Sequence, residues 1–314
     1  MIKPETFDIL ACPRCKGKLN YTNALLCETC GLEYPVVDGI PVLIDDKKSL
    51  FTVSDFVENR DTTYGRPASG WKKLVLRFIP SISLNIGSKE NFERFFAKVL
   101  EGGESPRVLI IGGAIEGQGL DTSALDPGIE LVETDVAFGD RTGLICDAHD
   151  LPFIDGSFDG VIAQAVLEHV VDPFRCVSEI ERVLRPGGLV YGETPFMQQV
   201  HMGRYDFLRF SHLGHRKLFQ NFSELSSGPV AGPGTSFVWA YAFLLRSFFR
   251  NRNLQNAAFA FGSLTGFWLK YLDLFLINKP GAVDAASAFY FIGEKTSEVL
   301  EDRKLIAGYR GAQR

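Results

Sequence analysis

The most constraining stretch of this 314-residue chain covers residues 144–188, where apolar runs and turn residues alternate in a fixed order. Residues 161–166 form a short apolar run, which predicts a strand buried on both faces of a parallel sheet. Residues 173–184 carry apolar side chains at helical spacing, and Pro186 stops that helix before a strand at residues 189–194. Such a crossover is right-handed, and ligands of these sheets bind beyond the carboxyl ends of the strands. The polar residues at that edge are Asp147, Glu168 and His169.

The short elements in this stretch occur in a recognisable order. An acidic residue closes a strand, and a Leu-Pro-Phe turn, a Phe-Asp step, a Leu-Glu-His end and an Arg-Pro-Gly-Gly turn follow. This order resembles the class I S-adenosylmethionine (SAM) dependent methyltransferases of the type 11-like group. The resemblance implies an α/β fold at residues 104–297, a seven-stranded doubly wound Rossmann-like sheet that binds SAM. Residues 224–230 and 288–293 fit its last two strands, which form an antiparallel edge.

A glycine-rich loop, GGAIEGQG at residues 112–119, follows the apolar run 107–111. Glycines let the backbone approach a ligand, and the amino end of a following helix would favour the SAM carboxylate. Alone, the loop also fits a dinucleotide site. The cofactor contacts that the resemblance implies come from Gly112, Gly113, Glu116, Gly117, Asp135, Asp147, Ala148 and Glu168.

Several of these contacts have alternatives. Asp135 matches the carboxylate that holds both ribose hydroxyls, and Glu133 is its rival, although only the terminal residue of the strand reaches the sheet edge. Asp147 matches the position that receives the adenine amino group, or it caps a helix. The family has an acidic residue where this chain has Ile110, so the contact to the cofactor amino group either passes to Glu116 or is lost.

Polar residues also gather at residues 201–216, where the family places side chains that close over the substrate. A hydroxyl acceptor needs a base to take its proton, and His201 or His169 is the candidate. We expect Tyr205, Asp206 and Arg209 to orient the acceptor. The alternative is that alignment with the sulfonium suffices without a base.

Two CxxC pairs precede the methyltransferase region. They consist of Cys12, Cys15, Cys27 and Cys30. Two such turns can aim four thiolates at one tetrahedral ion, which predicts a structural Zn²⁺ without an open position for catalysis. The segments FDILACPRCKGKL and YPVVDGIPVLI resemble the small zinc-ribbon family whose eukaryotic member activates tRNA and protein methyltransferases as a separate subunit. The resemblance implies a ribbon at residues 1–46, fused in cis, with a supporting or substrate-presenting role.

The remaining segments are predicted to be a linker with leading helices at residues 47–103, a helical insertion at about residues 236–280 and a polar tail at residues 298–314. The linker has an apolar stripe that suits either packing on the catalytic domain or contact with an anionic membrane surface. That stripe is Trp71, Leu74, Val75, Phe78 and Ile79.

The insertion is very apolar, but Lys270 and Asp273 make membrane spanning costly, at about 2.5 to 3.5 kcal/mol each near the bilayer centre. Three interpretations remain for it: a cap over the active site, an oligomer interface, or a contact with a membrane surface.

The net charge of -5 argues against a general nucleic-acid binder. The paired cysteines and the lack of a signal-peptide pattern indicate the cytoplasm, with the inner face of the membrane as an alternative. The predicted function is methyl transfer from SAM to an oxygen or carbon of a small or lipid-linked acceptor, such as a glycan sugar or an isoprenoid. The alternatives are an RNA methyltransferase that recognises its substrate through the ribbon, and a non-catalytic scaffold with a SAM fold.

Overall fold

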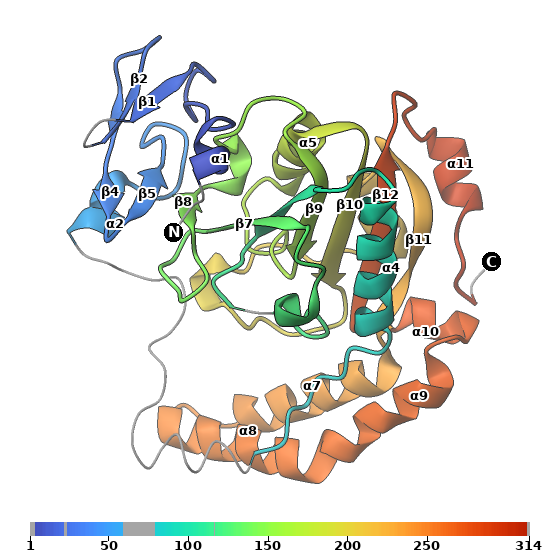
Figure 1. Ribbon diagram of the computed structural model, residues 1–314. Coiled ribbons are helices and arrows are strands. Elements are labelled where there is room, and N and C mark those ends of the chain that lie inside the picture. Colours follow the sequence, from blue (N-terminus) through green and yellow to red (C-terminus); the bar gives the residue numbers. More distant parts are fainter. Residues whose placement is uncertain (1–3, 22–23, 59–78, 116, 313–314) are drawn as a thin grey trace.

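The computed structural model describes residues 4–21, 24–58, 79–115 and 117–312 (Figure 1). Its main sheet has nine strands, and the five central ones, from β10 to β8, run parallel. In sheet order they are β11 (Phe222–Ala231), β12 (Ala288–Lys295), β10 (Leu184–Pro195), β9 (Phe158–Gln164), β6 (Arg107–Ile111), β7 (Glu130–Asp135), β8 (Leu144–Cys146), β5 (Ile40–Leu43) and β4 (Val36–Val37). β12 is antiparallel to both of its neighbours, as predicted for the edge of this fold.

Alternating side chains of the central strand β6 separate two layers of helices. Val108 and Ile110 belong to the core cluster of α4 (Ser88–Leu100), whereas Leu109 and Ile111 belong to that of α5 (Pro173–Val183). Alternation of this kind is expected for a strand buried on both faces. The chain order changes direction between β6 and β9, so the carboxyl ends of these two strands mark the expected ligand site.

The sheet is larger than the seven strands predicted because the N-terminal region adds two. Asp38 and Gly39 have φ angles of 51° and 81°, and they form the tight turn between β4 and β5. β5 then pairs in parallel with β8 through Val42 and Leu43. The edge of β8 is therefore covered by backbone hydrogen bonds, which the sequence pattern of either segment alone does not indicate.

The rest of the N-terminal region forms a small three-stranded sheet. Its elements are α1 (Pro4–Phe7), β1 (Leu19–Tyr21), β2 (Leu25–Cys27), β3 (Glu33–Tyr34) and, after the hairpin, α2 (Val53–Val57). Leu10 forms a bridge with Phe153, and Ala11 donates its backbone N–H to the carbonyl of Pro152. Leu10, Leu25 and Phe153 all belong to one hydrophobic cluster, so the ribbon and the large domain share a core.

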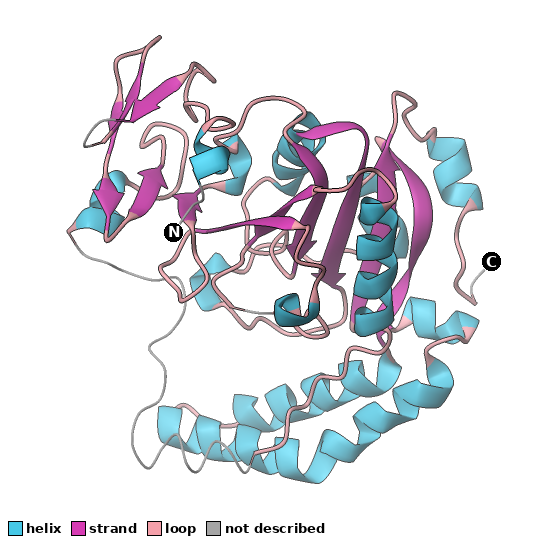
Figure 2. Cartoon of the chain, viewed as in Figure 1, coloured by secondary structure: helices cyan, strands magenta, loops and turns pink. Residues whose placement is uncertain are grey.

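A helical insertion separates β11 from β12. It comprises α7 (Pro233–Ser247), α8 (Arg252–Gly266), η4 (Phe267–Leu272), α9 (Asp273–Leu276) and α10 (Pro280–Asp284). Figures 1 and 2 show α7, α8 and α9 as a layer beyond the carboxyl ends of the parallel strands. A Cβ on Gly262 would lie 2.8 Å from the Cα of Ala242, so this glycine allows α7 and α8 to approach closely.

Both charged residues that made membrane spanning costly are buried within the insertion. Asp273 accepts hydrogen bonds from the backbone of Gly232, Gly234 and Thr235, where it compensates unpaired N–H groups at the start of α7. Lys270 donates to the carbonyl of Ser81. Among the described residues, no helix combines the length and the apolar character needed to cross a membrane.

Other expectations differ from the structure or lie outside it. Between β6 and β7 the described residues form only a three-residue turn, η1 (Thr122–Ala124), so the helix expected after the glycine loop is absent there. Gly119, Pro127 and Gly128 disfavour a helix in that segment. Within the predicted polar tail, α11 (Asp302–Ala307) forms. Of the predicted linker stripe, residues 71–78 lie outside the described residues.

Candidate active site and metal centre

A cavity of about 300 Å³ lies at the carboxyl ends of the central strands. Its lining combines the predicted cofactor residues with part of the predicted acceptor site. The predicted residues on its wall are Gly112, Gly117, Asp135, Asp147, Ala148, His169, His201 and Tyr205. One cavity therefore joins the two halves of the candidate active site.

The glycine loop brings its backbone to the wall of this cavity. Gly112 has a φ of 76°, and a Cβ there would lie 2.5 Å from Val166. Gly117 has no room for a Cβ beside Gln164. Gly113 instead donates its N–H to the carbonyl of Thr134 and supports the loop without lining the cavity. Glu116 lies outside the described residues.

The end of β7 separates the two candidate ribose ligands. Asp135 lines the cavity and accepts a 3.0 Å hydrogen bond from the backbone of Ala114. Glu133 forms an ion pair with Arg141 and does not line the cavity. A carboxylate has lone pairs for several donors, so Asp135 can hold the glycine loop and still receive ribose hydroxyls.

Asp147 caps the turn η2 (Ala148–Asp150), as in the alternative interpretation of this residue. It accepts hydrogen bonds from the backbone and ring Nδ1 of His149, at 2.9 and 2.6 Å, and from the hydroxyl of Ser49. Burial opposes ionisation, but the contacts with His149 and Ser49 keep the pKa of Asp147 below its ordinary value. A carboxylate held in this way is a fixed acceptor on the cavity wall.

Sequence reasoning missed several residues of the cavity wall, among them Leu50, Phe51, His149 and Gln164. Leu50 and Phe51 follow the ribbon directly, and Phe51 stacks on Tyr205 with ring centroids 5.9 Å apart. Nothing in the local pattern of residues 49–51 points to a ligand, because pairing of β5 with β8 brings them there. His149 directly follows the predicted cofactor residues Asp147 and Ala148, and this position in the sequence could have indicated that it lines the cavity.

The acceptor end of the cavity contains two histidine rings in contact. His169 and His201 have ring centroids 4.9 Å apart, and Tyr205 lies beside them. Burial, followed by the charge of His201, lowers the pKa of His169 to about 4. Burial also lowers the pKa of His201. Both rings are therefore neutral near pH 7 and present lone pairs.

Asp206 and Arg209 lie behind this wall and do not line the cavity. They form an ion pair, and Asp206 also accepts a 2.8 Å hydrogen bond from the backbone of His201. Burial opposes ionisation of Asp206, but hydrogen bonds from Arg209 and His201 lower its pKa to about 2. Asp206 thus holds the backbone at His201, and both members of the pair line a neighbouring cavity of about 440 Å³.

Glu168 is also placed differently from the prediction that it contacts the cofactor. Its side chain is fully buried behind the two histidine rings and is not part of the cavity wall. Burial raises its pKa to about 8. Neither carboxylate oxygen has a hydrogen-bond partner within the part of the chain that the structure describes.

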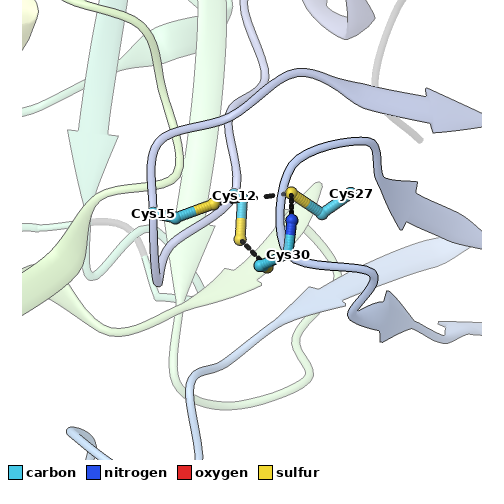
Figure 3. A group of neighbouring side chains, drawn as sticks. All are labelled: Cys12, Cys15, Cys27 and Cys30. Carbon is cyan, nitrogen blue, oxygen red and sulfur yellow. Dashed lines mark hydrogen bonds between the residues drawn. The ribbon is translucent and has the colours of Figure 1, made fainter.

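The four ribbon cysteines converge as predicted (Figure 3). The sulfur atoms of Cys12 and Cys30 are 3.7 Å apart, and those of Cys15 and Cys27 are 3.5 Å apart. Four sulfurs at about 2.3 Å from a tetrahedral Zn²⁺ would be about 3.8 Å apart, so the residues fit this ion. Tyr34 Oη lies 3.1 Å from Cys12 Sγ and can donate to a thiolate there.

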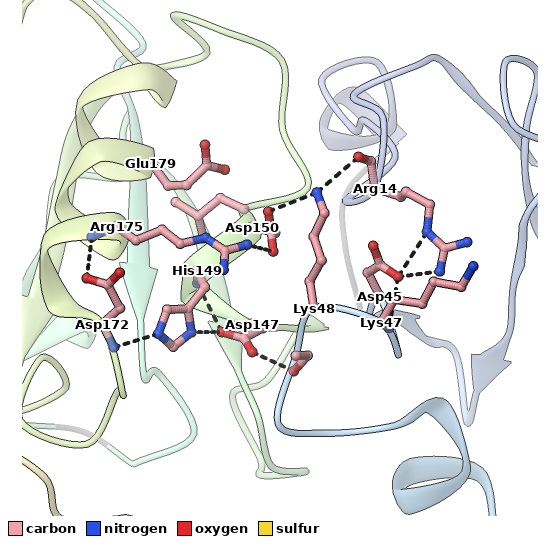
Figure 4. A network of polar contacts seen from close by, with 12 residues as sticks. Arg14, Asp45, Lys47, Lys48, Asp147, His149, Asp150, Asp172, Arg175 and Glu179 are labelled. Atoms are coloured by element: carbon pink, nitrogen blue, oxygen red, sulfur yellow. Dashed lines mark hydrogen bonds and ion pairs between the residues drawn. The ribbon is translucent and has the colours of Figure 1, made fainter.

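A polar network joins the ribbon to the cofactor wall (Figure 4). Arg14 pairs with Asp45, and Lys48 lies 3.7 Å from Asp150, which also pairs with Arg175. One residue further along, Ser49 binds Asp147. The other two cysteines, Cys146 and Cys176, are buried free thiols.

Comparison with known proteins agrees with both domains. Residues 114–192 match the family described as a methyltransferase domain, and residues 3–39 match the Trm112p-like proteins. A UPF0434 protein of Psychromonas ingrahamii is 50% identical over 50 residues, which are 15% of this chain and 85% of the relative. A UPF0434 protein of Methylobacillus flagellatus is 43% identical over 57 residues, which are 17% of this chain and 95% of the relative.

Solved structures are more distant. Phosphoethanolamine N-methyltransferase 2 of Haemonchus contortus has 16% identity and a TM-score of 0.44, covering 82% of this chain and 62% of its own. A methyltransferase complex with the Trm112 activator of Haloferax volcanii has 18% identity and a TM-score of 0.39, covering 67% of this chain and 94% of its own. Similarity at this level does not bear on the acceptor.

Proposed function

We propose that this chain methylates an oxygen of a lipid-linked acceptor at a membrane surface. The chain belongs to the Trm112p-like (UPF0434) family through its first domain, and its second domain is a SAM-dependent methyltransferase. The observation that carries this proposal is the exposed apolar face of the helical insertion. Nine of its large apolar side chains are more than half exposed. They are Phe237, Leu244, Phe248, Leu254, Phe261, Leu264, Trp268, Leu274 and Phe275.

These side chains repeat at helical spacing, which supports an organised surface. Phe237 and Leu244 lie on one stripe of α7, which Phe248 continues at the C-cap, while Val238 and Ala242 face the interior of the insertion. Phe248 and Phe275 are 75% and 77% exposed. Contiguous apolar surface of this kind is rare on proteins that do not bind a partner or a membrane.

The charge of the insertion supports an anionic lipid surface. Between residues 233 and 279 the sole acidic residue is Asp273, which is buried. Arg250, Arg252 and Lys279 are exposed on the same segment. Aromatic and aliphatic side chains beside cations are typical of helices that lie in the membrane interface.

Contact between the insertion and the acceptor end supports delivery from that surface. The Trp239 ring of α7 lies 6.1 Å from the His201 ring. Trp239 also donates a 2.9 Å hydrogen bond to Ser83. A lipid-linked head group that enters along α7 would therefore reach the histidine pair.

For the cofactor, the residues of the cavity wall have separate tasks. Asp135 would hold the ribose hydroxyls, Asp147 would meet the adenine edge, and Gly112 would allow close approach of the backbone. SAM itself supplies a methyl group on a sulfonium that is already a good leaving group. The protein is then left to align the acceptor oxygen with that methyl and to exclude water.

The ribbon's proposed role is to support the cofactor wall in cis. Ser49, Leu50 and Phe51 belong to the segment that the β5 pairing carries to the cavity, and Ser49 binds Asp147 directly. These contacts favour support over presentation of a substrate by the ribbon.

Calorimetric titration with SAM and S-adenosylhomocysteine, followed by transfer of labelled methyl groups, tests the proposal. Acceptors would be lipid-linked sugars in anionic vesicles, the same sugars without lipid, and total RNA. We expect micromolar cofactor binding and label in the vesicle fraction. Label in RNA alone would favour the alternative RNA methyltransferase, and no binding of either cofactor form would favour the scaffold.

A further inference from the structure

Three side chains converge at the acceptor end of the cavity. Glu168 and His169 follow β9, and His201 follows β10. One ligand atom from each lies within 4.8 Å of the others. Glu168 Oε1 is 3.6 Å from Nε2 of His169 and 4.0 Å from Nε2 of His201. These separations exceed a hydrogen bond, and they leave room for an ion about 2.1 Å from each ligand after a small adjustment.

The hydrogen bonds around the rings direct lone pairs at the carboxylate. His169 Nδ1 lies 2.8 Å from the carbonyl of Tyr205, so Nδ1 carries the proton and Nε2 is the acceptor. His201 Nδ1 faces the carbonyl of Gln199 at 3.4 Å and Asp206 at 3.5 Å. Three electron-pair donors thus face one another, which is unfavourable unless a cation or a proton lies between them.

Glu168 supplies the second, independent observation. Its carboxylate is fully buried, and neither oxygen has a donor among the described residues. Arg209, a nearby cation, is bound to Asp206. Buried carboxylates are normally paired or bound to a metal, and among the described residues this one has no hydrogen-bond donor.

We propose that Glu168, His169 and His201 bind a divalent first-row transition-metal ion, and that this ion binds an acceptor through two adjacent oxygens. Two imidazoles and one carboxylate suit such ions better than Mg²⁺ or Ca²⁺. Three protein ligands leave open positions toward the cavity, whose wall both rings line. The carbonyl of Tyr205 beside Nδ1 of His169 and the carboxylate of Asp206 beside Nδ1 of His201 would orient the two rings with Nε2 toward the ion.

The acceptor class follows from that geometry and rests on the proposed function. A vicinal diol or a hydroxyl beside a carbonyl would chelate the ion, which acidifies the bound hydroxyl so that its proton passes to water. The oxygen lone pair then forms the O–CH₃ bond as the S–CH₃ bond breaks, and that electron pair stays on sulfur as S-adenosylhomocysteine. A lipid-linked sugar carries such a diol.

Electron paramagnetic resonance of free Mn²⁺ measures the site without using activity. Mn²⁺ prefers oxygen and nitrogen ligands, so it leaves zinc on the ribbon thiolates. Titration of the full chain should show one bound Mn²⁺ per molecule. Affinity should fall at least tenfold in Glu168→Gln and in His201→Ala. The control is His212→Gln, whose ring packs against Phe289 and Tyr309 instead, and it should bind as the wild type does.

The metal site would be overturned if adding the wild type did not decrease the signal of free Mn²⁺, or if the wild type and the three variants bound Mn²⁺ equally well. Either result would favour a protonated Glu168. Calorimetry with SAM is run on the same samples to verify that the wild type and His201→Ala retain the cofactor cavity. Bound Mn²⁺ that a vicinal diol does not perturb would overturn the acceptor assignment alone. If the wild type bound Mn²⁺ but transferred no methyl group to the lipid-linked acceptors, this result would count against the proposed function and would not contradict the metal site.

Discussion

At the scale of single residues, the two carboxylates of β7 make the sharpest comparison. Asp135 lies on the cavity wall, whereas Glu133 is held by Arg141. We predict that Asp135→Ala weakens SAM binding about ten- to a hundredfold, because a hydrogen bond to a charged group contributes about 1.5 to 3 kcal/mol. Glu133→Gln should leave the affinity within about twofold. Calorimetry on both variants measures this, and the reverse order would move the ribose contact to Glu133.

His215 gives a prediction for pH dependence away from the site. Burial and the charges of His212 and Arg216 lower its pKa to about 3, against about 6.5 in an unfolded chain. Between these values the unfolded chain binds one more proton. The contribution of His215 to stability is therefore complete above pH 6.5 and falls as pH drops, by up to about 1.4 kcal/mol per unit.

Urea unfolding at pH 6.5 and 5.0 tests this. Between those values the wild type should lose about 2 kcal/mol more free energy of unfolding than His215→Gln, which no longer titrates. Lys217→Gln on the same helix, α6 (His212–Leu218), is the control and should follow the wild type. Parallel curves for wild type and His215→Gln would contradict the assignment.

Single residues also mark where sequence reasoning succeeds. Four cysteines at CxxC spacing predict their own convergence, because few other arrangements explain the pattern. Ser49 and Phe51 carry no such pattern and become part of the site through long-range pairing. Glu168 was assigned to the site from its motif, but its burial behind two rings is a property of packing alone.

At the scale of elements, the strands and the helical insertion were predictable, but the role of the insertion was not. Apolar runs bounded by turn residues located β6 and β9, and the family resemblance located β12. For the insertion, composition alone could not separate a cap, an interface and a membrane contact. Only the structure shows that Lys270 and Asp273 point inward while Phe275 points outward.

That outward face gives a prediction for α7 and α9. The double variant Phe248→Glu and Phe275→Glu should float with anionic vesicles at least tenfold less than the wild type at low salt, because it replaces apolar contacts by repelled charges. Both side chains are mostly exposed, so stability should change by no more than about 0.5 kcal/mol each. Ile306→Glu on α11 exposes a charge at a similarly open apolar site and should float normally. A wild type that stays at the bottom of the gradient would refute the membrane contact.

At the scale of the whole molecule, the ribbon and the sheet share one hydrophobic core. Ile9 and Leu25 share a cluster with Leu109 and Val161 of the central strands, and β5 extends the main sheet. Lys16 adds an ion pair to Glu179 on α5. A domain with its own core would unfold separately, whereas a shared core predicts a single transition.

Zinc removal should therefore affect parts of the chain far from the cysteines. Cys27→Ser loses one of four ligands, and the loss of a structural zinc ion costs several kcal/mol of folding free energy. At about 2 °C per kcal/mol for a chain of this size, the single calorimetric transition should fall by roughly 10 °C. SAM binding should weaken at the same time, because Ser49 and Phe51 are held at the cavity by the ribbon.

The control for zinc content is Cys176→Ala, which removes a buried thiol outside the zinc cluster. Two separate transitions, with the larger one unchanged in Cys27→Ser, would mean that the ribbon is an independent appendage and that its support of the cofactor wall is wrong.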